Sequence, residues 1–229
     1  FAVLTGGITQ IGLATNLVQI FDLHKFSWRM PPQYLQMARA GHAQVTLTDG
    51  RILVVGGRGI GKQLADGLSA AEIFDPLEGS STSVTPLPRR VPIPTAHVLS
   101  DGRVIVIGQR SAFVFDPSTT IWRPRIRLHQ VRRGHASILL PGGAVLVAGG
   151  EGQRSFELID EQQQESRLLS VKLPLALDDL RMVALSDRRV WVIGGQDTWS
   201  GDTTNRTWFV DVEDAESATI RAGPVLGVP

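Results

Sequence analysis

The feature that most constrains the fold is a pair of glycines, or a close variant of it, that recurs five times after a short apolar run. The copies are Gly6-Gly7, Gly56-Gly57, Gly108-Gln109, Gly149-Gly150 and Gly194-Gly195. The second positions of the pairs, 7, 57, 109, 150 and 195, lie 50, 52, 41 and 45 residues apart. Repetition at this period is typical of proteins that stack copies of one small structural unit.

Each unit has the features of a four-stranded antiparallel sheet. Asp49-Gly50 separates two apolar stretches, which is a strong hairpin signal, and the glycine pair follows the second stretch. A variable segment and a further apolar run then end at an aspartate, at positions 22, 75, 116, 160 and 211. We expect glycines at the end of the second strand because neighbouring backbone leaves no room there for a side chain. Such sheets bury both faces only by stacking on one another.

In this order of features the units resemble kelch repeats, and the resemblance covers nearly the whole chain. In two units a tryptophan, Trp28 or Trp122, follows the aspartate by six residues, as the resemblance requires. WD40 repeats are the nearest alternative, because Gly-His opens two units, but the terminal Trp-Asp of that family is missing. The resemblance implies an all-β, kelch-type β-propeller in one domain over residues 1–229, with about five visible four-stranded blades.

The blades are expected at about 1–38, 39–92, 93–130, 131–177 and 178–229, and the first lacks its opening strand. Two arrangements remain open: a small closed ring, or a larger ring with further blades outside these residues. The chain opens at Phe1 within an apparent strand, so we expect it to derive from a longer precursor.

The composition and charge of the chain exclude several kinds of site and interaction. The 229 residues include no cysteine, which excludes disulfides and thiolate metal sites. The net charge of +1 gives no general attraction to nucleic acid, and no apolar run reaches the roughly 18 residues of a membrane span. The sequence carries no signal for an oligomeric state. The repeats resemble those of bacterial extracytoplasmic kelch proteins, which implies an extracytoplasmic or secreted location.

The order of the strands predicts which face binds a partner. In a four-stranded up-and-down blade, the loop between strands two and three emerges on the same face as the connection to the next blade. These loops are unequal in length, at residues 8–16, 58–69, 110–112, 151–155 and 196–205. Variable loops on a rigid scaffold often carry function. We therefore expect the binding site on this face.

Residues 122–133 contain five arginines and no acid. Alternation along a strand would place Arg123, Arg125 and Arg127 on one side, with Arg110 on a neighbouring loop. Guanidinium groups suit carboxylates, phosphates and sulfated glycans. The alternative is a solvated or inter-blade arginine row, with Arg132 repeating Arg39 as a packing residue.

Trp199 lies in a glycine-containing loop together with Asp202. An exposed tryptophan can stack on a sugar or anchor a partner protein. The alternative is that it caps the edge of a blade.

His42 and His135 recur at the same repeat position, which indicates structural hydrogen bonding. We predict no catalytic residue, no metal site and no cofactor. The predicted function is a non-catalytic binding or assembly module that docks a protein partner or an acidic surface glycan. The alternative is a carbohydrate-active propeller enzyme, an isomerase, mutarotase or lyase, with its site at the channel mouth. Histidines, arginines and carboxylates converging there would favour the enzyme.

Overall fold

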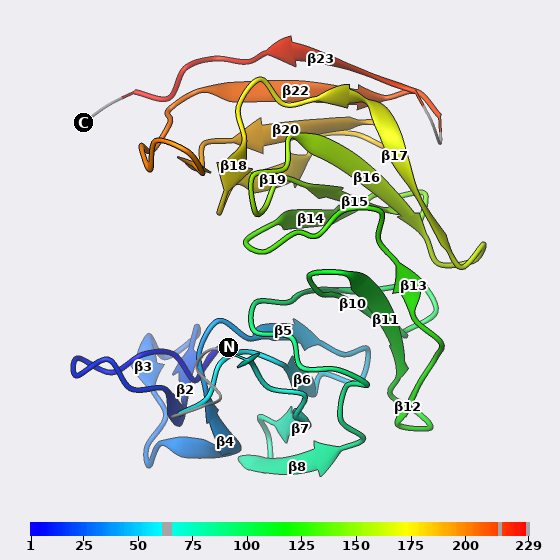
Figure 1. Ribbon diagram of the computed structural model, residues 1–229. Helices are drawn as coiled ribbons and strands as arrows, with labels where there is room; N and C mark the ends of the chain where they lie inside the picture. The colour runs from blue at the N-terminus through cyan, green and yellow to red at the C-terminus, as the bar shows by residue number, and fades with distance from the viewer. Residues whose placement is uncertain (61–65, 215–216, 228–229) are drawn as a thin grey trace. The chain divides into compact units, whose positions relative to one another are not determined.

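The computed structural model describes residues 1–60, 66–214 and 217–227, so part of the loop at 58–69 lies outside the described residues. All the elements with bounds in this part of the chain are β-strands (Figure 1). Among the described residues, no helix has the length and apolar character needed to cross a membrane. The chain divides into two compact units, Phe1–Val106 with Phe115–Arg123, and Ile107–Val114 with Pro124–Pro229.

The first unit contains two antiparallel sheets of four strands each. The strands of the first sheet are β1 (Ala2–Thr5), β2 (Thr15–Asp22), β3 (Ser27–Trp28) and β4 (Gln33–Arg39). Strand β1 lies at its edge, and both β3 and β4 pair with β2. The second sheet has the order β5 (Ala43–Thr46), β6 (Ile52–Val55), β7 (Ala71–Asp75) and β8 (Ser80–Val84).

The second unit contains two further four-stranded sheets and one short pair. One sheet has the order β14 (Ala136–Leu139), β15 (Val145–Ala148), β16 (Ser155–Asp160) and β17 (Glu165–Lys172). The other has the order β19 (Arg181–Ala184), β20 (Arg189–Ile193), β22 (Thr207–Val212) and β23 (Ala218–Ala222). The short pair is β18 (Leu177–Asp178) with β21 (Gln196–Asp197).

The third repeat is divided between the units. Its strands are β9 (Thr95–Val98), β10 (Val104–Ile107), β11 (Ser111–Asp116), β12 (Ile121–Trp122) and β13 (Ile126–Arg127). The end of β11 pairs with β12, through Phe115 and Asp116, within the first unit. The beginning of β11 pairs with β13, through Ser111 and Ala112, within the second.

The opening hairpins turn where the sequence predicts. Strand β5 pairs with β6 in register, and the N–H of Leu47 donates to the carbonyl of Arg51 at 2.7 Å to close the turn. Gly50 supplies the left-handed residue, with φ +87°. Strand β6, which follows, lies between β5 and β7 in the sheet, and all its residues are buried on both faces. This accounts for the unbroken apolar run in the sequence.

The paired glycines lie where other chain segments approach closely. A Cβ atom on Gly56 would lie 2.7 Å from the carbonyl oxygen of Val91, and one on Gly57 would lie 2.8 Å from the Cβ of His42. Both glycines also have left-handed φ angles, +64° and +92°. No other residue satisfies both conditions without displacing the connection that follows the sheet. The repeated four-stranded sheets fit a β-propeller-like fold.

Candidate functional site

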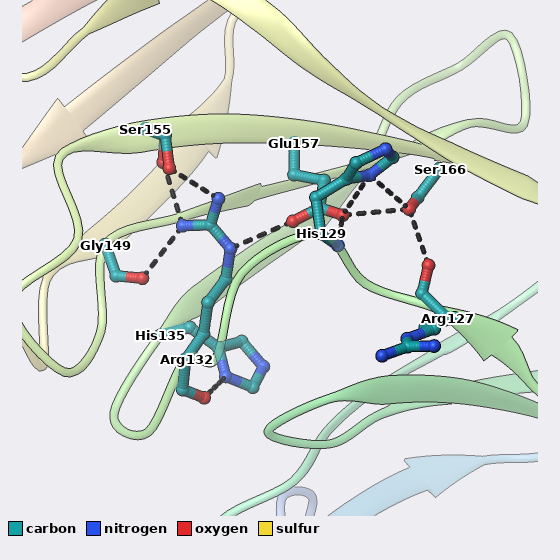
Figure 2. Close-up of polar contacts among 8 residues, drawn as sticks. All are labelled: Arg127, His129, Arg132, His135, Gly149, Ser155, Glu157 and Ser166. Atoms are coloured by element: carbon teal, nitrogen blue, oxygen red, sulfur yellow. Dashed lines mark hydrogen bonds and ion pairs between the residues drawn. The ribbon is translucent and has the colours of Figure 1, made fainter.

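A fully buried ion pair organises the second unit (Figure 2). Arg132 and Glu157 each have no exposed side-chain surface, and Arg132 Nε lies 3.2 Å from Glu157 Oε2. Arg132 Nη1 donates to the carbonyls of Gly149 and Ser155, at 3.1 and 2.9 Å, and Nη2 donates to Ser155 Oγ at 2.8 Å. Burial lowers the pKa of Arg132, and Glu157 opposes that shift. The charge is therefore compensated within the fold.

Glu157 also fixes the connection that leads into β14. Its Oε1 accepts the backbone N–H of His129 at 2.6 Å and lies 2.8 Å from Ser166 Oγ. Ser166 Oγ lies 2.8 Å from the carbonyl oxygen of Arg127 as well, so its single proton can serve either acceptor. Arg127 contributes only its backbone to this network, as Figure 2 shows. Hydrogen bonds to Glu157 and Ser166 therefore fix the segment from Arg127 to Arg132.

A similar network occurs in the first unit. Arg39 Nη2 lies 2.5 Å from Glu72 Oε1, with both side chains buried. Glu72 Oε2 accepts the N–H of Gln36 and the hydroxyl of Ser81, each at 2.6 Å. Gln36 precedes its arginine by three residues and Ser81 follows its glutamate by nine, as in the second unit. The ion pair is thus an element of the repeat.

The third and fifth repeats carry apolar residues at both positions of the ion pair. Val91 and Phe113 occupy them in the third repeat, and Leu177 and Trp208 in the fifth, all less than 5% exposed. Arginine and glutamate are therefore present together or absent together.

The repeated histidines are hydrogen-bonded, His135 as a buried residue and His42 as a half-buried one. His135 Nδ1 lies 2.9 Å from the carbonyl oxygen of Arg132, and His42 Nε2 lies 2.8 Å from Thr5 Oγ1. Burial lowers the pKa of each imidazole to about 4, with the neighbouring Arg39 also lowering that of His42. Both rings are neutral at neutral pH, and this geometry serves the fold.

Ser166, His129 and Glu157 lie together without the geometry of a catalytic triad. Both Ser166 Oγ and Glu157 Oε1 lie 3.2 Å from the same ring atom, His129 Nδ1. A triad needs the serine at one ring nitrogen and the carboxylate at the other, so that the ring can relay a proton. The cluster is a scaffold for the backbone.

Loops and connections meet on one face of the second unit, as the strand order predicts. Leu128 N–H donates to the Arg110 carbonyl at 3.0 Å, Gly150 N–H to the Leu177 carbonyl at 2.9 Å, and Thr198 N–H to the Ala176 carbonyl at 2.9 Å. We call the surface formed by residues 109–110, 128–135, 150–154, 173–180 and 196–203 the loop face.

A row of arginines, which we call the basic strip, lies along the loop at 109–110 of this face and along the segment at 125–133, which leads through β13 into β14: Arg110, Arg125, Arg127 and Arg133. All four are exposed. Ser111 pairs with Arg127 in the sheet, and the N–H of Arg132 donates to the carbonyl of Gln109, so the strip follows one loop and one connection. Within the described residues, no ion pair joins any of the four to a carboxylate. The strip is available to an acidic ligand.

Arg123 does not belong to this strip, so the predicted alternation of Arg123, Arg125 and Arg127 along one strand is wrong. Strand β12 ends at Trp122 and β13 begins at Ile126. Pro124 interrupts the strand because it has no N–H to give to the sheet. Arg123 lies in the first unit, where it lines a pocket formed by hairpin turns.

Trp199 lies on a hydrogen-bonded turn of the loop face. Asp197 Oδ1 accepts the backbone N–H groups of Trp199 and Ser200, at 2.9 and 3.1 Å, and the carbonyl of Asp202 accepts the N–H of Asp197 at 2.8 Å. A Cβ on Gly152, in the preceding loop, would lie 3.4 Å from the indole. The side chain is 81% exposed, which does not fit a residue that caps a blade edge.

No protein-family model and no curated protein sequence matches the chain. Among solved structures, the chain is similar to one titled "Structure of YjhT", with a TM-score of 0.74 and 15% sequence identity. The match covers 96% of this chain and 80% of that one. The likeness is one of fold. It supports a β-propeller-like architecture.

Sequence reasoning recognised Arg39 and Arg132 as repeat positions but missed their partners, Glu72 and Glu157. A signal was present in the sequence. Glutamate occurs three residues before the aspartate that ends the third strand only in the two repeats that carry the arginine. Comparing repeats position by position would have paired them.

Proposed function

We propose that this chain is part of a kelch-type β-propeller that acts extracytoplasmically as a non-catalytic binding or assembly module. Its loop face docks an acidic partner, on a protein or a surface glycan. The observation that carries the proposal is the basic strip: four exposed arginines along one loop and one neighbouring segment, with no carboxylate paired to them among the described residues.

The buried network beneath the strip supports binding. Glu157 accepts the N–H of His129, and Ser166 lies against the carbonyl of Arg127, so the backbone that carries the arginines is fixed before any ligand arrives. A preorganised surface loses less conformational entropy on association than a mobile one. Guanidinium groups held in this way favour bidentate contacts with carboxylates or sulfates.

Trp199 supports the same conclusion. Its turn is closed by backbone hydrogen bonds, and most of the indole is in contact with solvent. Rigid tryptophans on loops are frequent anchors in interfaces, because they bury a large area at little entropic cost. We expect Trp199 to contribute contact area and the strip to contribute charge recognition.

The proposal is tested with two acidic probes, a heparin-derived oligosaccharide and a poly-glutamate peptide, by biolayer interferometry at low and physiological salt. Replacing Arg110, Arg125 and Arg127 together by glutamine should weaken binding about tenfold or more and reduce its salt dependence. A matched variant replaces Arg167, Arg188 and Arg221, which are exposed elsewhere in the second unit, by glutamine. It removes the same charge.

Retained binding in the matched variant, with loss in the first, is the expected result. Equal loss in both would mean that net charge alone attracts the probes, and equal retention would mean that the strip does not bind them. Either outcome would overturn the proposal.

A further inference from the structure

A polar pocket lies at the hairpin turns of the first unit, and it shares no residue with the basic strip. Its volume is about 550 Å³, within the roughly 300–1,000 Å³ typical of sites for small ligands. Charged side chains from the second and third repeats line it: Asp49, Arg51, Asp101, Arg103, Asp116 and Arg123. The pocket thus has three carboxylates and three guanidinium groups.

Two copies of one turn form most of the wall. In each copy the aspartate accepts the backbone N–H of the arginine two residues later, at 3.0 Å in both Asp49–Arg51 and Asp101–Arg103. Its other oxygen accepts the guanidinium Nε, at 2.8 and 2.6 Å respectively. A Cβ on Gly102 would lie 3.5 Å from the side chain of Thr48, so the two turns are in contact.

The third repeat supplies the remaining wall. Asp116 Oδ1 accepts the N–H and the hydroxyl of Ser118, at 2.9 and 2.6 Å. These hydrogen bonds, the hydroxyl first, lower the pKa of Asp116, and those from Arg51 lower the pKa of Asp49. Burial works against ionisation of Asp101, but the hydrogen bonds from Arg103 outweigh it and its pKa is also lowered. All three groups are carboxylates at neutral pH.

The fold does not need these charges. The fourth repeat forms the same turn, with the N–H of Leu140 donating to the carbonyl of Ala144 at 2.8 Å and that of Gly143 to the carbonyl of Leu140 at 2.8 Å. Gly142 and Ala144 there replace the aspartate and the arginine. The charged pairs in the second and third repeats are therefore additional to what the hairpin requires.

We propose that this pocket binds a neutral carbohydrate of one or two rings. Each turn aspartate is already compensated by the arginine of its own turn, so a ligand need not bring a charge. Carboxylate oxygens accept hydrogen bonds from sugar hydroxyls, and guanidinium groups donate to them. Clustered donors and acceptors of this kind match a polyol, whose hydroxyls do both.

Other ligand classes fit less well. A phosphate or sulfate would face three carboxylates, and a cation would face three guanidinium groups. No group of three His, Cys, Asp or Glu side chains suited to a metal occurs in the part of the chain that the structure describes. An apolar ligand would find only Leu47 and Pro117 as larger apolar neighbours in the lining.

The test uses NMR titration of the chain with maltose, lactose and N-acetylglucosamine, and with inorganic phosphate as the competing chemistry. At least one saccharide should shift the amides of Gly50, Gly102 and Ser118. The double variant Asp101→Gly with Arg103→Ala copies the turn of the fourth repeat, so it keeps the fold and should weaken binding about tenfold or more. The same substitutions at Asp187 and Arg189, in the fifth repeat, are the control and should leave binding unchanged.

The proposal is overturned if no saccharide shifts these amides, if phosphate binds more tightly than every saccharide, or if both double variants bind alike. These outcomes are independent of the basic strip, because the variants leave Arg110, Arg125 and Arg127 intact. Failure of one proposal is therefore distinguishable from failure of the other.

Discussion

Glu157→Gln isolates the charge of the buried ion pair while keeping the size of the side chain. Arg132 has no exposed surface, and Glu157 is its only ionic partner among the described residues. Removing one partner of a buried pair costs roughly 3–5 kcal/mol, because the remaining charge is left uncompensated. Since folded domains are stable by about 5–15 kcal/mol, we expect the second unit to lose a large share of its stability.

The third repeat shows how to restore the site. It carries valine and phenylalanine where the fourth carries Arg132 and Glu157. Replacing a buried ion pair by apolar residues is often neutral or stabilising. In this case, however, the carbonyls of Gly149 and Ser155 lose the hydrogen bonds that Arg132 donates. Each group left unsatisfied costs about 1–3 kcal/mol. We expect Arg132→Val with Glu157→Phe to cost less than Arg132→Val and Glu157→Gln added together, because the double variant leaves no uncompensated charge.

Hydrogen exchange in dilute urea measures this effect in each unit separately. Strand β15 is paired on both sides and reports on the second unit, and β6 reports on the first as an internal control. Protection should fall in β15 in each single variant, and in the double variant it should fall by less than the two single effects added together. A cost below about 1 kcal/mol for Glu157→Gln, or a double variant that costs as much as both single variants together, would refute the reasoning.

Three further outcomes are expected. The pKa of His135 is about 4 in the folded state and about 6.5 in the unfolded state. The contribution of this histidine to the free energy of unfolding is therefore complete above pH 6.5 and falls by on the order of 3 kcal/mol as the pH decreases towards 4. His135→Gln should flatten this dependence of the urea midpoint on pH. Gly7→Ala should cost roughly 1–3 kcal/mol of stability through the left-handed φ alone. Gly150→Ala should cost more, because its Cβ would also lie 2.9 Å from the carbonyl oxygen of Arg133. Equal urea midpoints for the two variants would contradict this steric argument. Trp199→Ala should change stability by less than about 0.5 kcal/mol, and a loss above about 1 kcal/mol in thermal unfolding would mark it as a packing residue.

The parts of the fold that local chemistry determines could be predicted from the sequence. The hairpin at Asp49-Gly50 depends on a two-residue signal, and the sheet that follows depends on an apolar run such as residues 52–55. The common face of loops and connections followed from strand order alone. Each of these inferences needs only neighbouring residues or a count of strands.

The parts that escaped prediction depend on contacts between distant residues or on a single interruption. Glu157 lies on strand β16 and Arg132 on the connection before β14, and nothing in either local sequence demands the other. Arg123 was placed with Arg125 and Arg127 because alternation assumes a continuous strand, which Pro124 prevents. The pocket beside Arg123 depends on two turns that lie in contact although they are about 50 residues apart.

The apolar pair and the ion pair found at the same repeat positions differ in the hydrogen bonds that they can make. An apolar pair such as Leu177 and Trp208 fills space, but it offers no acceptor to the connection that crosses it. Glu157 accepts the N–H of His129, and in the first unit Glu72 accepts that of Gln36. The ionic version therefore fixes the connection as well as the core.

The fixed connection carries different surfaces in the two units. In the second unit this segment presents Arg127 and Arg133, and in the first, where it is strand β4, it presents Tyr34, which is 57% exposed, and Met37. Both units have a buried network of arginine, glutamate and serine at this repeat position, so the exposed residues can differ while their support is kept. A partner that recognises the basic strip should therefore bind more weakly when Arg127 changes, even though the network beneath, which uses only the backbone of that residue, stays intact.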